Sequence, residues 1–485
     1  MHTGFFRGSR RYAELTGRTG GTVREPRAAE YGFPYSERHL RCVWFDPAFR
    51  PPVLHTHAGE EVVVENPGRW NLEAGPDFYE ATLRVGPERR RLCGDVELHL
   101  RAAGWKTHGH VGDPRYARVI AHVTYFPGAV GAEHLPAGAV EVALKSDLAA
   151  NPFFSFESLD VTAYPYAARA PKTPCAELLA GAPDRLAAVL ESAGEERLRI
   201  KAERLALAVA ERGIEQTLYE EILCALGYKN NRVPFRHLAR KVTLEALRAE
   251  CAGDARRAYS LLLGVAGLLP AKLSPSWDEE TREFVRRLWD IWWKQRSGWE
   301  SAVMPRSAWV LAGQRPQNHP LRRLMAAAAL FSRETGLADR IRDAGRPTPE
   351  AWLGEVSAML QPADPTGYWD RRTGLAGRPQ KSATALVGPG RVAAMLSNVV
   401  LPFAAAAAAR SRLPPGDALL RALPPEEDNA LVAQTAHALL GRDHNPALYR
   451  TALRQQGLLQ VFHDFCLNDR SHCESCPFPE ALRAG

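Results

Sequence analysis

The spacing of apolar residues predicts a β-sheet in the first third of the chain. Residues 92–100 alternate strictly, so that Val96, Leu98 and Leu100 share one face of a strand and Glu97 and His99 share the other. Similar patterns, rich in β-branched residues, predict further strands at 53–56, 61–65, 79–85, 119–125 and 141–144. We therefore expect a mixed sheet together with one short helix near residues 114–118.

Beyond residue 174 the apolar positions change to helical spacing. The segment 183–210 begins with a proline, which suits a first helical position, and repeats leucine about every fourth residue. The sequence predicts an α+β protein in four parts. These are a flexible basic tail over 1–30, a mixed α/β domain over 31–150, a connector over 151–174 that is rich in proline and aromatic residues, and a helical domain over 175–485 that ends in a cysteine cluster.

Composition narrows the class of protein. The 485 residues are 45% hydrophobic and 24% charged, which is typical of a globular protein, and the net charge of +7 favours nucleic acid as a partner. The longest apolar run, 392–409, contains Pro402, and we expect a buried helix with a break there and no membrane span. No secretory signal is evident and most cysteines are scattered, so we expect reduced thiols and a cytoplasmic protein.

Two acidic residues in the sheet region suggest metal chemistry. Pro76-Asp77, followed after nineteen residues by Glu97-Leu98-His99, resembles the PD…(D/E)xK signature of nucleases. The resemblance implies a restriction-endonuclease-like sheet in which Asp77 and Glu97 bind Mg²⁺ or Mn²⁺. His99 stands where that signature has lysine, and we assign it a role as base or water-orienting group. Lys106 would then supply the missing cation. The alternative is that Asp77 ends a turn and Glu97 lies on a solvated strand face.

The same stretch allows a second metal site. His108-Gly109-His110 places two imidazoles in one loop, and His99, His122 and Asp113 lie near them in the sequence. Imidazole with carboxylate suits Zn²⁺, Fe²⁺ or Mn²⁺, as in metal hydrolases or oxygenases. His122 lies in an apolar strand, and for that residue we favour an ordinary core histidine.

The chain ends in a cysteine cluster with metal-site spacing. Cys466, Cys473 and Cys476 follow the pattern C-x6-C-x2-C, which is similar to the iron–sulfur tail of endonuclease III-type DNA glycosylases. Leu482 stands where that pattern has its fourth cysteine, so His463, His472 or a thiolate from elsewhere, such as Cys42 or Cys175, would complete a Zn²⁺ or iron–sulfur site. The alternative is a set of reduced thiols in a helix-terminal turn.

A basic segment in the helical part is a candidate phosphate-binding surface. Arg315, Arg322 and Arg323 flank the expected start of a helix, where guanidinium groups and backbone N–H groups both favour anions. Together with Lys106, they are the residues we assign to nucleic-acid binding. The alternative is a solvated helix cap.

Several longer motifs resemble one bacterial family. They are GPDF at 75–78, GDVELHL at 94–100, WKTHGH at 105–110, RVIAHVTY at 118–125, GYKNNRVPF at 227–235 and LLLGVAGLLP at 261–270. Together they resemble the proteins grouped as domain of unknown function 2851, over about residues 31–476. This resemblance supports the segment boundaries and implies no activity.

These observations lead to one expected function and two alternatives. We expect a divalent-metal-dependent nuclease that hydrolyses phosphodiesters. The first alternative is a non-catalytic protein with a degraded enzyme fold that binds nucleic acid or a protein partner. The second is a zinc or iron hydrolase that acts on a small molecule.

Overall fold

The computed structural model describes most of the chain in two compact units. The described residues are 6–15, 33, 35–71, 75–151, 154–159, 161, 164, 183–228, 230–344, 348–407, 416–426, 430–441, 444–466, 476 and 478–479. One unit, here the sheet unit, comprises Ala13–Ala188, Ala430–Pro446 and Leu458–Gly485, and the other, the helical unit, comprises Met1–Tyr12, Val189–Asn429 and Ala447–Gly457. The expected α+β class is confirmed.

The described part of the sheet unit contains a mixed seven-stranded sheet. Its strands are β1 (Leu54–His55), β2 (Glu61–Asn66), β3 (Arg69–Trp70), β4 (Phe78–Val85), β5 (Arg90–His99), β6 (Val119–Thr124) and β7 (Val140–Ala143). The order is β1-β2-β4-β5-β6-β7, with β3 paired to β4. Pairs from β1 to β5 are antiparallel, whereas β6 runs parallel to both β5 and β7.

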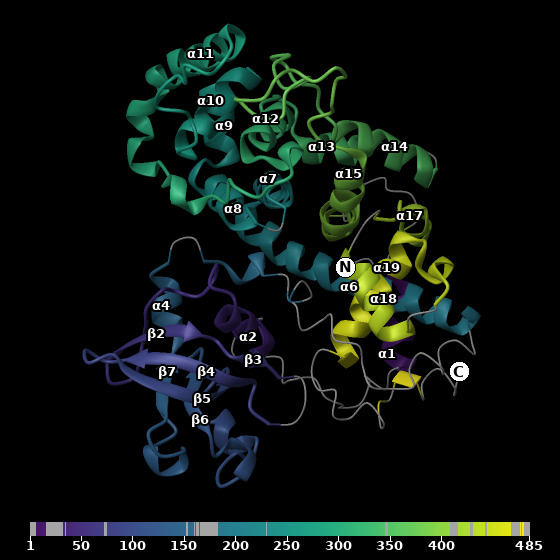
Figure 1. Cartoon of the computed structure of the whole chain (residues 1–485). Coiled ribbons are helices and arrows are strands. Elements are labelled where there is room, and N and C mark those ends of the chain that lie inside the picture. The colour runs from purple at the N-terminus through teal and green to yellow at the C-terminus, as the bar shows by residue number, and fades with distance from the viewer. Residues whose placement is uncertain are drawn as a thin grey trace. The chain divides into compact units, whose positions relative to one another are not determined.

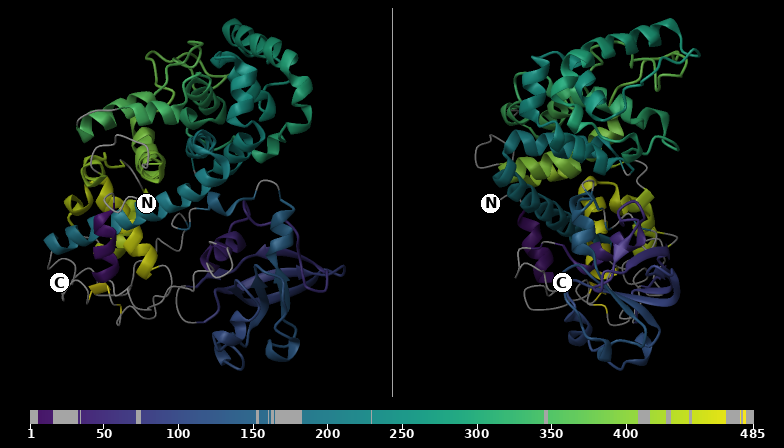
Figure 2. Two further views of the ribbon diagram at one scale, coloured as in Figure 1. Left: turned by 180° about the vertical axis from the view of Figure 1, so that it is seen from behind. Right: turned by 90° about the vertical axis from the view of Figure 1, so that its left-hand side faces the viewer.

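The sheet curls until its two edges meet. An isolated bridge joins Thr56, directly after β1, to Val142 in β7. Figure 2 shows the curled sheet from two further sides. The curl covers strand edges that would otherwise expose unpaired backbone groups.

The central strand β5 is buried on both faces along its second half. The helix α2 (Glu37–Phe45) packs against β5, and its Glu37 carboxylate accepts a hydrogen bond from Leu100 N–H just beyond the strand (Figure 1). Because strand residues alternate between faces, burial of the whole strand end forces Glu97 and His99 into a covered environment. Polar side chains in such a place need partners of their own.

Short helices surround the sheet. The α-helices α3 (Gly104–Thr107) and α4 (Leu144–Ala149) follow β5 and β7. The helix expected near 114–118 is a 3-10 helix at Pro114–Tyr116, and Asp113 caps it through Arg115 N–H.

The other 3-10 helices of the described chain are Ala132–His134, Phe156–Ser158, Arg296–Gly298, Glu300–Ala302, Arg306–Ala308, Pro316–Asn318 and Pro446–Tyr449.

The remaining α-helices lie beyond residue 174, where the sequence predicts helical spacing, except for α1, which falls in the segment 1–30 that was expected to be a flexible tail. They are α1 (Arg7–Leu15), α6 (Pro183–Arg212), α7 (Ile214–Leu226), α8 (Arg232–Lys241), α9 (Leu244–Cys251), α10 (Ala255–Val265), α11 (Glu279–Gln295), α12 (Pro320–Phe331), α13 (Leu337–Asp343), α14 (Pro349–Met359), α15 (Pro389–Met395), α16 (Leu401–Ala407), α17 (Gly416–Ala422), α18 (Ala430–Leu440) and α19 (Ala452–Val461). Within the helical unit, α7 packs on α8, and α10 packs on α11 and α12.

One helix of the described residues, Pro389–Ala407, is long and apolar enough to cross a membrane, and 67% of its apolar window is buried inside the protein. It consists of α15, a π-helical turn at Leu396–Val400 and α16. The expected break at Pro402 is therefore a widened turn within a continuous helix. A π-turn is a common way to admit an irregular backbone position without ending a helix.

Candidate metal centre

Three imidazoles converge at the end of β5. Their ring nitrogens, from His99, His108 and His110, lie within 4.8 Å of one another. His99 is the last residue of β5, and its ring packs so closely on Gly104 that a Cβ there would lie 2.6 Å from it. His108 and His110 leave α3 on either side of Gly109, whose φ of +76° belongs to the left-handed region that favours glycine. This turn directs both side chains to the same place.

A carboxylate completes the group. Glu97 Oε1 lies 3.2 Å from His110 Nε2 and 3.5 Å from His99 Nε2, and His99 Nε2 lies 3.1 Å from His108 Nδ1. A tetrahedral ion with metal–nitrogen distances of about 2.0–2.1 Å would separate neighbouring ligand atoms by about 3.3 Å. The three spacings given above lie near that value, and the three histidines as a set have ring nitrogens within 4.8 Å of one another.

One ring nitrogen of the group lacks a hydrogen bond among the described residues. His110 Nε2 is buried and makes no hydrogen bond in the part of the chain that the structure describes, although Glu97 Oε1 is close. A buried ring nitrogen without a hydrogen bond is costly unless an ion takes its lone pair. His108 is exposed, whereas His99 and His110 are buried, so the group is open to solvent on the His108 side.

A chain of polar groups runs behind His99 across the three parallel strands. His99 Nδ1 lies 3.0 Å from His122 Nε2, and His122 Nδ1 faces Glu141 Oε1 at 3.6 Å. The register places Glu97, His122 and Glu141 side by side, and Glu141 also accepts a hydrogen bond from Val130 N–H at 2.7 Å. With protons on Nδ1 of both histidines, the lone pair of His99 Nε2 would be available to a metal ion.

Burial controls the charges of the group. It raises the pKa of Glu97 to about 8, against the opposing effects of Arg41 and of the Asp77 N–H group. Burial also lowers the pKa of His99 well below its usual range, and the neighbouring histidines lower it further. Burial lowers the pKa of His110 as well, and the charges of Asp77 and Asp113 partly offset this effect. Neutral imidazoles are the form that binds metal ions.

The structure brings Asp77 and Glu97 together, but mainly through the backbone. Asp77 N–H donates to Glu97 Oε2 at 3.0 Å, whereas the Asp77 carboxylate accepts from Leu98 N–H at 2.9 Å and pairs with Arg41 Nε at 2.8 Å. Asp77 thus ties α2, β4 and β5 together. Lys106, the expected cation, is exposed on α3.

Aromatic rings form the remaining wall. The Tyr116 ring stacks on His110 with centroids 3.9 Å apart, and Trp105 packs edge-on against His110 and tilted against His122. Burial raises the pKa of the Tyr116 hydroxyl. Asp113, which we grouped with the histidines, pairs instead with Arg115 at 2.6 Å and caps a turn.

Sequence reasoning did not single out Arg41, Tyr116 or Glu141. Arg41 lies on a helix some forty residues before its partner Asp77, and Glu141 lies two strands from His99, so local patterns do not connect them. The only available signal was the pair of strands predicted at 119–125 and 141–144, since pairing of these two strands would place the acidic residue of the second beside His122 of the first.

The other predicted site residues lie elsewhere. Cys466 ends a π-helical turn and is half-buried, as is Cys476, whereas Cys473 and His472 lie outside the described residues. His463 Nδ1 lies 3.3 Å from Asp464 Oδ1. A metal site at the cysteines therefore stays a prediction.

The predicted basic segment divides into exposed and buried residues. Arg315 is exposed. Arg322 donates to the carbonyls of Trp369, Thr384 and Ala385, and Arg323 donates to the carbonyl of Leu386 and the hydroxyl of Tyr228. These two buried guanidinium groups hold a long irregular segment in place. Nucleic-acid binding by this segment stays a prediction.

Comparison with known proteins gives one match. The family described as "Protein of unknown function (DUF2851)" matches residues 37–429. The chain belongs to this family. No curated protein and no solved structure matches it. The match to the DUF2851 family covers α2, the whole sheet and most of the helical unit, so it includes every residue of the histidine group.

Proposed function

We propose that this DUF2851 protein is a divalent-metal-dependent hydrolase whose ion is held by His99, His108 and His110, with Glu97 beside it. The observation that carries the proposal is the buried Nε2 of His110, which makes no hydrogen bond among the described residues and lies 3.2 Å from Glu97 Oε1 within the histidine group. The chain of His122 and Glu141 behind His99 supports it, because metal-bound histidines usually donate their other N–H to such a partner.

The ligand types favour zinc. Three imidazole nitrogens suit Zn²⁺, and Mn²⁺ less well, whereas Mg²⁺ prefers oxygen ligands. The Mg²⁺ site expected on Asp77 and Glu97 has weaker support, since the Asp77 carboxylate is engaged by Arg41 and Leu98 N–H.

Glu97 is the residue that we propose moves the proton. With three histidine ligands, a fourth position remains for water, and the ion would lower the pKa of that water to about 7. Glu97 Oε1 lies within reach of the same position, because it is 3.2 Å from one ligand nitrogen and 3.5 Å from another. Burial raises the pKa of Glu97 to about 8 in the metal-free protein, and a bound cation would favour its ionised form. This carboxylate would then accept the proton of the attacking water and return it to the leaving group.

Phosphodiesters of nucleic acid are the substrate class that we propose first. The net charge of +7 and the exposed Lys106, on the helix that leads into His108, both favour an anionic substrate. A small-molecule zinc hydrolase is the second candidate, favoured by the nitrogen-rich ligand set. If Glu97 itself were the fourth ligand, the closed site would instead be structural.

The test combines metal content with activity. We expect purified protein to bind one Zn²⁺, and cleavage of single- or double-stranded DNA or RNA to depend on added Zn²⁺ or Mn²⁺. The double variant His108→Ala/His110→Ala should lose both, and Glu97→Gln should keep the metal and lose cleavage. His134→Ala, whose ring lies 3.2 Å from the exposed Glu133, is the matched control. A double variant that binds as many zinc ions per chain as the wild type would refute the proposed site.

A further inference from the structure

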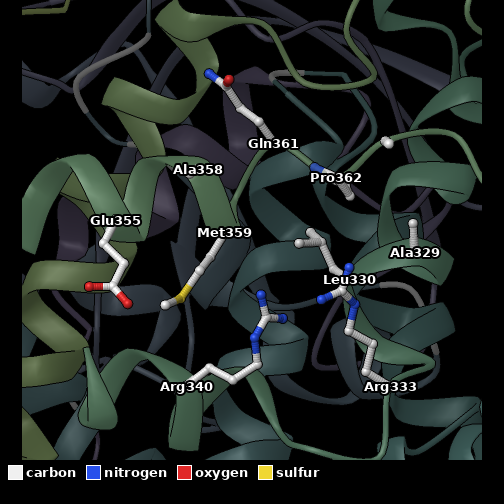
Figure 3. Close-up of a pocket in the computed structure, with 10 residues that line it drawn as sticks. Ala329, Leu330, Arg333, Arg340, Glu355, Ala358, Met359, Gln361 and Pro362 are labelled. Carbon is white, nitrogen blue, oxygen red and sulfur yellow. The ribbon is translucent and has the colours of Figure 1, made fainter.

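The helical unit contains a pocket of about 380 Å³ with an uncommon charge arrangement. Its walls come from α12, which carries Leu330, from α13, which carries Arg340, and from α14, which carries Glu355 and Met359, while Arg333 follows the end of α12. This volume lies within the range of small-molecule sites, about 300–1,000 Å³. Figure 3 shows the guanidinium groups of Arg333 and Arg340 lying near each other, with Met359 between Arg340 and Glu355.

The two guanidinium groups have no acidic partner. Within the described residues, neither side chain of Arg333 or Arg340 makes a hydrogen bond or ion pair. Burial lowers the pKa of Arg340, and the charge of Arg333 lowers it further. The neighbouring Arg342 shows the ordinary arrangement, because it contacts both Asp339 and Asp343. Two like charges facing one partly covered cavity repel each other unless an anion lies between them.

The helix that presents Arg340 is fixed independently of the pocket. Glu215 accepts hydrogen bonds from Ala338 N–H and Asp339 N–H at the start of α13, and it pairs with Arg248 at 3.0 Å. Gly336 lies against the same carboxylate, with space for no Cβ. The position of Arg340 is therefore set by contacts on the far end of α13, and the repulsion is not relieved by moving the helix.

We propose that this pocket binds a phosphate group that carries an apolar body. Two guanidinium groups supply the charge and the paired donors that a phosphate monoester dianion accepts. Leu330 and Met359 provide the apolar wall for the rest of the ligand. The source is either a phosphorylated small molecule or the terminal phosphate of a nucleic acid. This site lies in the helical unit and does not depend on the metal centre.

The experiment measures ligand-dependent stability and binding with three probes: inorganic phosphate, phenyl phosphate and a 5′-phosphorylated DNA decamer. We expect saturable binding of phenyl phosphate, tighter than that of inorganic phosphate, and a rise in melting temperature with ligand concentration. Arg333→Gln and Arg340→Gln should each weaken binding by about tenfold or more. Arg287→Gln, an exposed arginine that pairs with Glu283 at 2.9 Å, is the matched control.

The unliganded variants separate binding from architecture. Because repulsion is relieved, Arg333→Gln and Arg340→Gln should melt at the same temperature as the wild type or higher. A lower melting temperature without ligand, equal binding in all four proteins, or no saturable binding by the wild type would each overturn the proposal. Tighter binding of the decamer with its 5′-phosphate than without it, lost in both variants, would identify nucleic acid as the source of the phosphate.

Discussion

His99 Nδ1 lies 3.0 Å from His122 Nε2 across the parallel pair of strands β5 and β6. Neither ring is accessible to solvent. Two imidazole nitrogens at this distance share a single hydrogen, which lies on His99 Nδ1 or on His122 Nε2 according to the tautomers. When the N–H group at His122 Nδ1 faces the Glu141 carboxylate and the shared hydrogen lies on His99 Nδ1, the lone pair of His99 Nε2 is directed to the neighbouring histidines.

Removing the charge at the end of this chain should weaken the metal site. We expect Glu141→Gln to lower zinc affinity by about tenfold or more, because outer partners of metal-bound histidines typically contribute that much. Competition with a chromophoric chelator measures the affinity. Glu133→Gln, an exposed acid next to His134, is the control. Unchanged affinity in Glu141→Gln, with the wild type binding one zinc, would refute the chain and leave the site intact.

The turn between His108 and His110 allows a sharper comparison. Gly109 and Gly112 both have positive φ, +76° and +72°, and a Cβ at either position meets nothing within 4 Å. Alanine should therefore destabilise folding by a similar amount at both, about 1 kcal/mol, through backbone strain alone. Only Gly109→Ala should also weaken zinc binding, because Gly109 forms the turn that directs His108 and His110 to the same place. Equal zinc affinities in the two variants would contradict this arrangement.

Glu97 should make the metal-free protein less stable as the pH rises. Its pKa is raised to about 8 from 4.5, so the folded state holds a proton that the unfolded state releases. Its stabilising contribution is complete below pH 4.5 and is lost progressively as the pH rises through 8, on the order of a few kcal/mol. Urea denaturation with chelator at several pH values measures this loss.

The variant Glu97→Gln isolates this contribution from that of the histidines. The lowered pKa values of His99 and His110 act in the opposite direction, since stability from these groups is regained as the pH rises towards 6.5. The wild type should therefore lose more stability than Glu97→Gln between pH 6.5 and pH 8. Parallel profiles for the two proteins would show that Glu97 is not protonated in the folded state.

Asp77 should matter to folding even without metal. Its carboxylate pairs with the mostly buried Arg41 and accepts from Leu98 N–H, so Asp77→Asn leaves a buried cation without its anion. We expect a loss on the order of 3 kcal/mol in the free energy of unfolding of the metal-free protein. Glu65→Gln, which breaks the solvent-exposed pair with Arg84, should have little effect. A residue that acted only as a metal ligand would show no loss in chelator.

Much of the sheet unit follows from local pattern. Alternation predicted the strands that became β4 and β5, and the change to helical spacing near residue 183 marks the start of α6. The period of two also placed Glu97 and His99 on one face, where the structure has them 3.5 Å apart. The glycine of His108-Gly109-His110 indicated a turn for a comparable reason, since few other residues adopt positive φ.

Long-range contacts are what local pattern does not contain. The two acidic residues of the nuclease-like signature contact each other through the Asp77 N–H group, and the carboxylate of Asp77 pairs with Arg41, which comes from α2. His122 is buried as expected of a core histidine, but it also contacts His99. Arg322 and Arg323 looked like a surface for anions, and their burial depends on carbonyl groups some sixty residues later.

The sequence by itself determined which residues are able to bind a metal ion and which of them share a strand or a turn, because side-chain chemistry and backbone period are local properties. The tertiary structure decided which of them act together. The sheet places Glu141 of β7 beside His122 of β6. Burial shifts the pKa values of Glu97, His99 and His110. The fold gathers three histidines and Glu97 at one place and pairs the Asp77 carboxylate with Arg41, because distance and desolvation depend on the fold as a whole.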